Sequence, residues 1–174
     1  MIDFRESLPV VIGAVIAVIL QIIIAPAIEL FAAMPNFITV YCLLVAIVRP
    51  TASGPVLPFV LGFINDLCVG TPVGSSSLAL VLVCFVAARA FAVLNNDTVF
   101  IPLLVMVVAA FLIELIMGLF ALSFGAATGL LDALVFRALP CGLYDCVIGL
   151  LLFPLASRFL VPPSPMGSGT PAHL

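Results

Sequence analysis

Long stretches without a charged residue are the feature that most constrains how this chain can fold. Ser7 to Ile28 form an uncharged run of 22 residues, and the 174 residues hold five arginines, no lysine and eight acidic side chains. Only 7% of the residues are charged and 66% are hydrophobic, whereas a soluble domain carries about 25% charged and about 45–50% apolar residues. This composition excludes a water-exposed globular fold, a disordered chain and a basic protein that binds nucleic acid. The sequence therefore predicts an all-α membrane protein.

The apolar runs and the turn signals between them predict a bundle of six transmembrane helices. A single transmembrane domain, residues 1–161, is expected to hold spans at about 7–28, 35–48, 55–69, 77–94, 99–124 and 141–161. The second and third spans are expected to be short, because turns with proline or glycine flank them in the sequence. Between the last two spans in the sequence, a short amphipathic helix, capped by Thr128 and ending near Leu139, is expected to lie at the membrane interface without crossing. Residues 162–174 are rich in Pro, Gly and Ser and form a predicted flexible cytoplasmic tail.

The five arginines predict the orientation of the bundle. Six spans place both termini on one side, and four arginines fall near that side: Arg5, Arg49, Arg89 and Arg158. Arg137 alone falls on the other side. Because basic residues concentrate on the cytoplasmic side of a membrane, we expect both termini to be cytoplasmic.

Three acidic residues fall within the predicted spans, and all three lie in the outer half of the membrane in this orientation. They are Asp66, Glu114 and Asp145. An ionisable group at membrane depth is costly and is tolerated mainly when it is paired or serves a pathway. One interpretation is a polar cluster that binds a substrate, an ion or an arginine of a partner. The other is that each carboxyl is protonated or hydrogen-bonded within the bundle and fixes helix packing.

Residues for catalysis or metal binding are scarce. The single histidine, His173, lies in the predicted tail, so no histidine-based general base or metal triad can form within the bundle. The serines at 75–77 are typical of a turn or a helix cap, and the five cysteines lie mostly in apolar spans without a CxxC or Cys/His spacing. We therefore predict that the protein is not an enzyme and binds neither a metal nor a cofactor.

A glycine and aspartate pattern in the third span provides the most specific motif. Residues 62–74 read GFINDLCVGTPVG, a G-F-x-x-D-L-x-x-G-x-x-x-G pattern before an apolar helix. This segment resembles the third-span signature of the rod shape-determining protein MreD family. Three further features occur in the order expected of that family: Leu20-Gln21 near the end of the first span, Pro35-Asn36-Phe37 opening the second, and Glu114 deep in the fifth. The resemblance covers about residues 8 to 161, although this chain has fewer basic residues at its cytoplasmic ends and a tail with no counterpart.

The resemblance implies a non-enzymatic subunit of the machinery that builds lateral peptidoglycan and maintains rod shape, in the bacterial inner membrane. Proteins of this kind associate with MreC, a single-span partner, and through it with MreB filaments, the glycosyltransferase RodA and a class-B penicillin-binding protein. The family is also similar in fold to the substrate-binding components of energy-coupling-factor transporters. The alternative function is therefore a membrane subunit that binds a small, vitamin-type molecule.

The resemblance also selects the site residues Gly62, Asp66, Gly70 and Gly74. Gly62 and Asp66 are one helical turn apart, so the glycine would open space beside the carboxylate for an approaching helix or a backbone N–H. Gly70 and Gly74 would allow the tight reversal into the fourth span. Our hypothesis is that Asp66 is a polar connection at the outer end of the bundle, oriented toward the surface or groove that a partner's transmembrane helix uses. Together with Glu114 and Asp145, these residues are the candidates for partner binding or for structural polar contacts.

Overall fold

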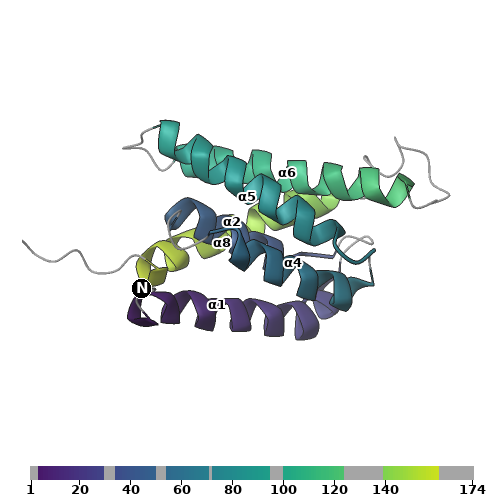
Figure 1. The fold of residues 1–174 in the computed structure, drawn as a ribbon, viewed down its shortest axis with the longest axis horizontal. Helices are drawn as coiled ribbons and strands as arrows, with labels where there is room; N and C mark the ends of the chain where they lie inside the picture. Colours follow the sequence, from purple (N-terminus) through teal and green to yellow (C-terminus); the bar gives the residue numbers. More distant parts are fainter. Residues whose placement is uncertain are drawn as a thin grey trace, which may run out of the picture.

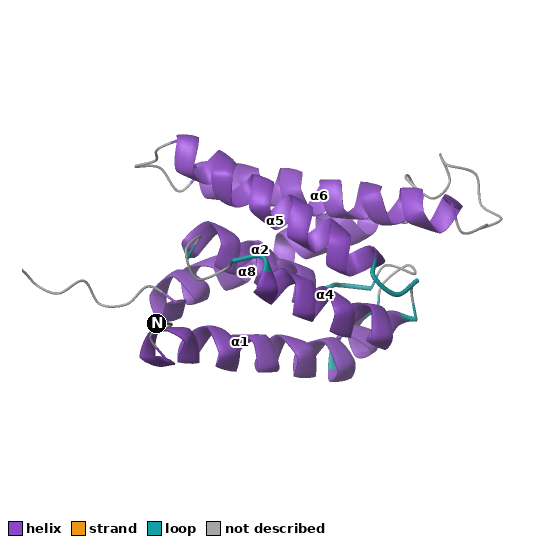
Figure 2. Cartoon of the chain, in the orientation of Figure 1, coloured by secondary structure: helices purple, strands orange, loops and turns teal. Residues whose placement is uncertain are grey.

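Six α-helices and one short 3₁₀ helix make up the described part of the chain. A computed structural model describes residues 4–29, 34–49, 54–70, 72–94, 100–123 and 139–160. Its elements are α1 (Phe4–Ile23), η1 (Ala25–Ile28), α2 (Phe37–Val48), α4 (Val56–Val69), α5 (Ser75–Leu94), α6 (Phe100–Ser123) and α8 (Leu139–Leu160). Figure 2 shows helices and connecting loops but no strand in these ranges. The predicted all-α class is confirmed.

The helices lie along a common long axis. In Figure 1, α5 and α6 form the upper edge, α1 forms the lower edge, and α2, α4 and α8 lie between them. α2 packs against α1, α4, α5, α6 and α8. The bundle is therefore built around its second helix.

The enclosure of α2 follows from its sequence. FITVYCLLVAIV is apolar on every face, and a helix that is apolar all round is stable when its whole circumference is covered. Ten of its twelve residues are buried, and Val40, Leu43 and Val45 have no exposed surface. The core of the protein is centred on this helix.

Small residues allow neighbouring helices to approach closely. Gly13 on α1 lies against the ring of Tyr41 on α2, whose hydroxyl donates a hydrogen bond of 2.6 Å to the Val10 carbonyl. Gly149 on α8 likewise lies against the side chain of Met106 on α6. A larger side chain at either glycine would require Tyr41 or Met106 to move, and such close approach at small residues is common between helices within a membrane.

The outer surface of the bundle is apolar, as expected of a membrane protein. Leu, Ile, Val and Phe side chains on α1, α4, α5, α6 and α8 are exposed by a third or more of their surface, among them Ile16, Phe59, Leu82 and Leu151. Three helical segments are long and apolar enough to cross a membrane: Ser75–Val93, Ile101–Phe120 and Leu139–Leu160. Shorter apolar helices cover Leu8–Ile23, Phe37–Val48 and Val56–Val69.

The short second and third spans of the prediction correspond to α2 and α4. Their 12 and 14 residues extend about 18 and 21 Å, less than the hydrocarbon thickness of about 30 Å. That all six helices cross the bilayer completely therefore stays a prediction.

Several helix boundaries differ from the predicted spans for local reasons. α1 begins at Phe4 and ends at Ile23, where η1 takes over with Pro26 in its first turn, because proline cannot continue the backbone hydrogen bonding of an α-helix. α5 begins at Ser75, two residues before the predicted span. α8 includes Pro140 in its first turn, a position that tolerates proline. The predicted interfacial helix before residue 139, Arg137 and the predicted tail lie outside the described residues.

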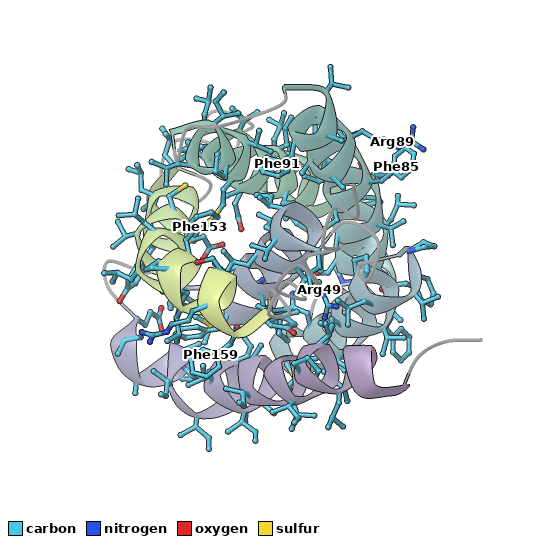
Figure 3. All side chains as sticks on the ribbon, turned by 90° about the vertical axis from the view of Figure 1, so that its left-hand side faces the viewer. Arg49, Phe85, Arg89, Phe91, Phe153 and Phe159 are labelled. Atoms are coloured by element: carbon cyan, nitrogen blue, oxygen red, sulfur yellow. The ribbon has the colours of Figure 1, made fainter. Side chains whose placement is uncertain are left out.

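The described arginines lie toward the end of the bundle where α1 begins. In Figure 1, α1 begins and α8 ends at the same end, and Figure 3 views the molecule from that end, with Arg49 and Arg89 labelled. Arg49 directly follows α2, and Arg158 lies in the last turn of α8. Asp66 lies in the last turn of α4, and Asp145 lies near the start of α8. The basic residues and these two carboxylates therefore occupy opposite halves.

The enclosure of α2 predicts a large difference between buried and lipid-facing leucines. Leu43→Ala should lower the free energy of unfolding by about 2–5 kcal/mol, because it removes a fully buried side chain and leaves a cavity. Leu82→Ala should have a much smaller effect, since Leu82 is 50% exposed on α5. Titration of both variants with SDS, followed by circular dichroism, measures the difference. Equal losses of stability would show that α2 is not enclosed.

Candidate functional site

The reversal between α4 and α5 depends on two glycines. α4 ends at Gly70, which has φ 73° and ψ 25° and donates its N–H to the Asp66 carbonyl at 3.0 Å. Gly74, directly before α5, has φ 100°. A Cβ at either position would meet no atom within 4 Å, so glycine is required there for its backbone conformation and not for space.

The Asp66 carboxylate binds the first residues of α5. One oxygen, Oδ2, accepts a hydrogen bond of 2.7 Å from the Gly74 N–H, and Oδ1 accepts one of 3.0 Å from the Ser76 N–H. The Ser75 hydroxyl is 3.3 Å from Oδ1 but 2.7 Å from the Pro72 carbonyl, so its single proton favours Pro72. Asp66 is 1% exposed. A side chain of α4 thus caps the start of α5, where N–H groups have no partner within the helix and a negative charge is favourable.

Gly62 brings the two helices close enough for this cap. A methyl group at position 62 would lie 2.5 Å from the Ser77 Cα and 2.7 Å from its backbone nitrogen, closer than carbon atoms approach without bonding. One turn later on α4, Asn65 donates its side-chain N–H to the Ser76 hydroxyl at 3.2 Å. The start of α5 therefore lies directly on the backbone of α4.

A second carboxylate caps the start of α2 in the same way. Oδ1 of Asp145 on α8 accepts a hydrogen bond of 2.7 Å from the Asn36 N–H. The Asn36 side chain accepts from the Thr39 N–H at 3.1 Å, and Gln21 on α1 accepts from the Phe37 N–H at 2.8 Å. Three helices therefore meet at the first turn of α2, since α1 and α8 both supply acceptors for it.

Tyr144 lies beside this second cap, and Glu114 lies on the neighbouring helix α6. Glu114 is partly buried. Tyr144, the neighbour of Asp145, donates its hydroxyl to the Ile28 carbonyl at the end of η1, at 2.9 Å. α8 is thus connected to both segments that precede α2.

The predicted site residues do not gather in one place in the structure. Most of them lie at the start of α5, and Asp145 lies at the start of α2. Gly62, Asp66, Gly70 and Gly74 all act at the α4–α5 reversal. Asp145 acts at the start of α2, and Glu114 lies separately on α6. Asp66 is enclosed, and its oxygens face the start of α5. These oxygens are therefore directed into the bundle, toward α5, and not toward its outer surface.

Three further polar residues take part in these caps without a role predicted from the sequence: Gln21, Asn36 and Asn65. Gln21 and Asn36 belong to the features that resemble the MreD family. Asn36 carries a signal that could have been used, because asparagine directly before an apolar helix is a common N-cap. Gln21 and Asn65 act across helix contacts. No spacing along the chain predicts such partners.

The buried acids of the site serve as hydrogen-bond acceptors between helices. Among the residues that the structure describes, no three His, Cys, Asp or Glu side chains gather as they would around a metal ion. A groove of about 160 Å³ between α5 and α6 is lined by valine, alanine and leucine side chains and has no polar lining. Both carboxylate oxygens of Asp66 and one oxygen of Asp145 accept hydrogen bonds from backbone N–H groups, and such contacts hold helices together.

These observations define an integral membrane protein made of helices, whose buried acids cap helix starts. The family model of the rod shape-determining protein MreD matches residues 4–161. The chain belongs to the MreD family, and a role in rod-shape determination follows. No curated protein and no solved structure matches the chain.

Removal of the Asp66 carboxylate should destabilise the start of α5. Asp66→Ala should lower the free energy of unfolding by about 2–4 kcal/mol, because the N–H groups of Gly74 and Ser76 lose a charged acceptor in an apolar interior. Asp66→Asn should lose less, since its amide keeps one oxygen acceptor. Denaturant titration in detergent measures both variants. If Asp66→Ala unfolds at the same midpoint as the wild type, the cap contributes nothing to stability.

Two glycine substitutions should have opposite effects. Gly62→Ala should cost about 1–3 kcal/mol, because its methyl group would press on the backbone of Ser77. Gly118→Ala on α6 is the matched control, since a Cβ there meets no atom within 4 Å and alanine favours a helix by about 1 kcal/mol over glycine. Thermal unfolding of the two purified variants gives the comparison. A neutral Gly62→Ala would contradict the close approach of α4 and α5.

Proposed function

We propose that this protein is a non-enzymatic scaffold of the bacterial cell-elongation machinery in the inner membrane, where it binds a single-span protein similar to MreC. The observation that carries the proposal is the family match over residues 4–161, which includes every helix of the bundle. Through that partner the protein would connect to MreB-like filaments, a RodA-like glycosyltransferase and a class-B penicillin-binding protein.

The use of the buried acids supports a scaffold. Asp66 accepts backbone N–H groups with both oxygens, and Asp145 accepts one with a single oxygen. These hydrogen bonds connect α4 to α5 and α8 to the start of α2. A rigid bundle with an apolar outer surface offers a fixed face to a transmembrane helix of another protein. The scaffold would present its partner with a preformed surface.

The orientation of the proposed scaffold has both termini in the cytoplasm. The described arginines lie toward the end where α1 begins, and basic residues favour the cytoplasmic side. The two capped helix starts would then lie toward the outer side, where the partner continues out of the membrane.

The groove between α5 and α6 does not favour the alternative, a subunit that binds a small vitamin-type molecule. Its volume of about 160 Å³ is below the range of about 300–1,000 Å³ of typical ligand pockets. Its lining also lacks the polar groups that orient such ligands. Native mass spectrometry of the solubilised protein would reveal a retained small molecule if the alternative were correct.

Copurification tests the proposed scaffold. The tagged chain should recover its single-span partner from membranes in mild detergent, and Gly62→Leu and Asp66→Ala should lower that recovery several-fold, because each disturbs the α4–α5 reversal. In a strain that depends on the plasmid copy, the same variants should round the cells. Gly118→Ala is the control that should keep both partner and rod shape.

Two outcomes would contradict parts of this proposal. Failure of the wild-type chain to recover the partner would contradict the scaffold. Normal recovery and normal shape with both α4 variants would contradict the assignment of the site. Circular dichroism of the same samples identifies a variant that fails only because it does not fold.

A further inference from the structure

Arg89 lies on the outside of α5, within a helical segment that is long and apolar enough to cross a membrane. The segment covers Ser75–Val93, so Arg89 lies four residues before its end, about 6 Å along the axis. The side chain is exposed, and within the described part of the chain it contacts the Phe85 ring and forms no ion pair. A cation at the lipid-facing surface of a span is costly unless an anion or water reaches it. Arg89 therefore requires an anionic partner from outside the described bundle.

The Phe85 ring holds one face of the guanidinium group. The central carbon of that group lies 5.0 Å from the ring centre, within the distance of a cation–π contact. Phe85 lies one turn before Arg89 and is 60% exposed, and Figure 3 shows both side chains on the outside of the bundle. The N–H donors of a guanidinium group point outward in its plane. A ring on one face thus leaves these donors available to an anion.

The apolar groove between α5 and α6 begins beside this arginine. Its volume is about 160 Å³, and on α5 it is lined by Val83, Val86, Ala87 and Ala90, which cover about 10 Å of the helix axis. Val86 and Val108 in its lining are 55% and 51% exposed, so the groove is open toward the lipid. Val86 lies three residues before Arg89 and is its neighbour on the helix surface. A cation and an open apolar groove therefore lie side by side on α5.

We propose that Arg89 and the α5–α6 groove bind one anionic phospholipid, with its phosphate at the guanidinium group and an acyl chain in the groove. An arginine this close to the end of a span can extend its side chain to the headgroup region. Guanidinium and phosphate match in shape, because two N–H donors meet two oxygens. Arg49 and Arg158 lie toward the same end of the bundle, and this excess of positive charge favours a headgroup with a net negative charge.

The size of the groove favours an acyl chain over a transmembrane helix of a partner. A helix with its side chains is about 10–12 Å in diameter, too wide for a groove of about 160 Å³. An acyl chain is a single row of methylene groups, and the remainder of the lipid stays in the bilayer. A groove too small to enclose a vitamin-type molecule therefore still suits a lipid. This lipid site goes beyond the scaffold function and does not depend on a partner protein.

Native mass spectrometry of the purified full chain tests the lipid site. The chain in detergent is titrated with phosphatidylglycerol, which is anionic, and in parallel with phosphatidylcholine, which carries the same phosphate but no net charge. One phosphatidylglycerol should bind about fivefold more tightly than phosphatidylcholine. Arg89→Gln should weaken the binding of phosphatidylglycerol about fivefold, the effect of one arginine near an anionic headgroup. Inorganic phosphate at the concentration of the lipid should not compete, because it fills no groove.

A second variant and a matched control locate the lipid. Ala90→Leu keeps Arg89 and should also weaken the binding several-fold, since its larger side chain fills part of the groove that Ala90 lines. Arg158→Gln is the control, because it removes the same charge from an exposed arginine at the same end of the bundle, on a helix that does not line the groove. Its affinity for phosphatidylglycerol should stay within twofold of the wild type. Circular dichroism shows whether each variant is folded.

Three results would overturn the lipid site. Equal binding of phosphatidylglycerol by Arg89→Gln and the wild type, or an equal loss in Arg158→Gln, would show a general attraction to the basic end of the bundle. Competition by inorganic phosphate would show an anion site without a role for the groove. Loss of the partner in copurification by an Arg89→Gln variant that keeps its lipid would assign Arg89 to an acid of the partner. Recovery of the partner by the wild-type chain tests the scaffold proposal separately.

Discussion

The structure depends on how N–H groups at helix starts are satisfied inside an apolar bundle. The first turn of every helix leaves N–H groups without a partner, and hydrocarbon offers no acceptor for them. Here the acceptors come from other helices: Asp66 on α4 serves α5, and Asp145 on α8 serves α2. Because each cap joins two helices, the same hydrogen bonds that satisfy the backbone also fix the arrangement of the bundle. Two of the few charged residues of this apolar chain thus serve backbone N–H groups at helix starts.

The sequence was sufficient for the fold class and for the motif, but only in part for the contacts. Uncharged apolar runs and proline-rich turns predicted a helical membrane protein with short second and third spans, since those signals are local in the chain. The spacing from Gly62 to Gly74 pointed to one structural unit, and all four of its marked residues act at the α4–α5 reversal. Local patterns therefore predicted elements and one turn reliably.

Contacts between distant segments were beyond such patterns. Asp145 was selected only as an acid in a span, and the Asn36 N–H that it accepts lies 109 residues earlier. Gln21 was noted for its place near the end of the first span, yet its role requires the start of α2 beside it. The direction of the Asp66 carboxylate, inward to α5 and not outward to a surface, likewise follows from packing, because Gly62 admits the backbone of Ser77.

The separation between Asn36 and Asp145 has a consequence for biosynthesis. α2 is made early, but the carboxylate that accepts from its start is made 109 residues later, on α8, the last helix of the described residues. During synthesis the nascent α2 has neither this acceptor nor the neighbours α5, α6 and α8 that cover its surface. A helix of 12 residues is also too short to cross the bilayer alone. The centre of the bundle is therefore completed last, when the final helix enters the membrane and closes around a segment inserted long before it.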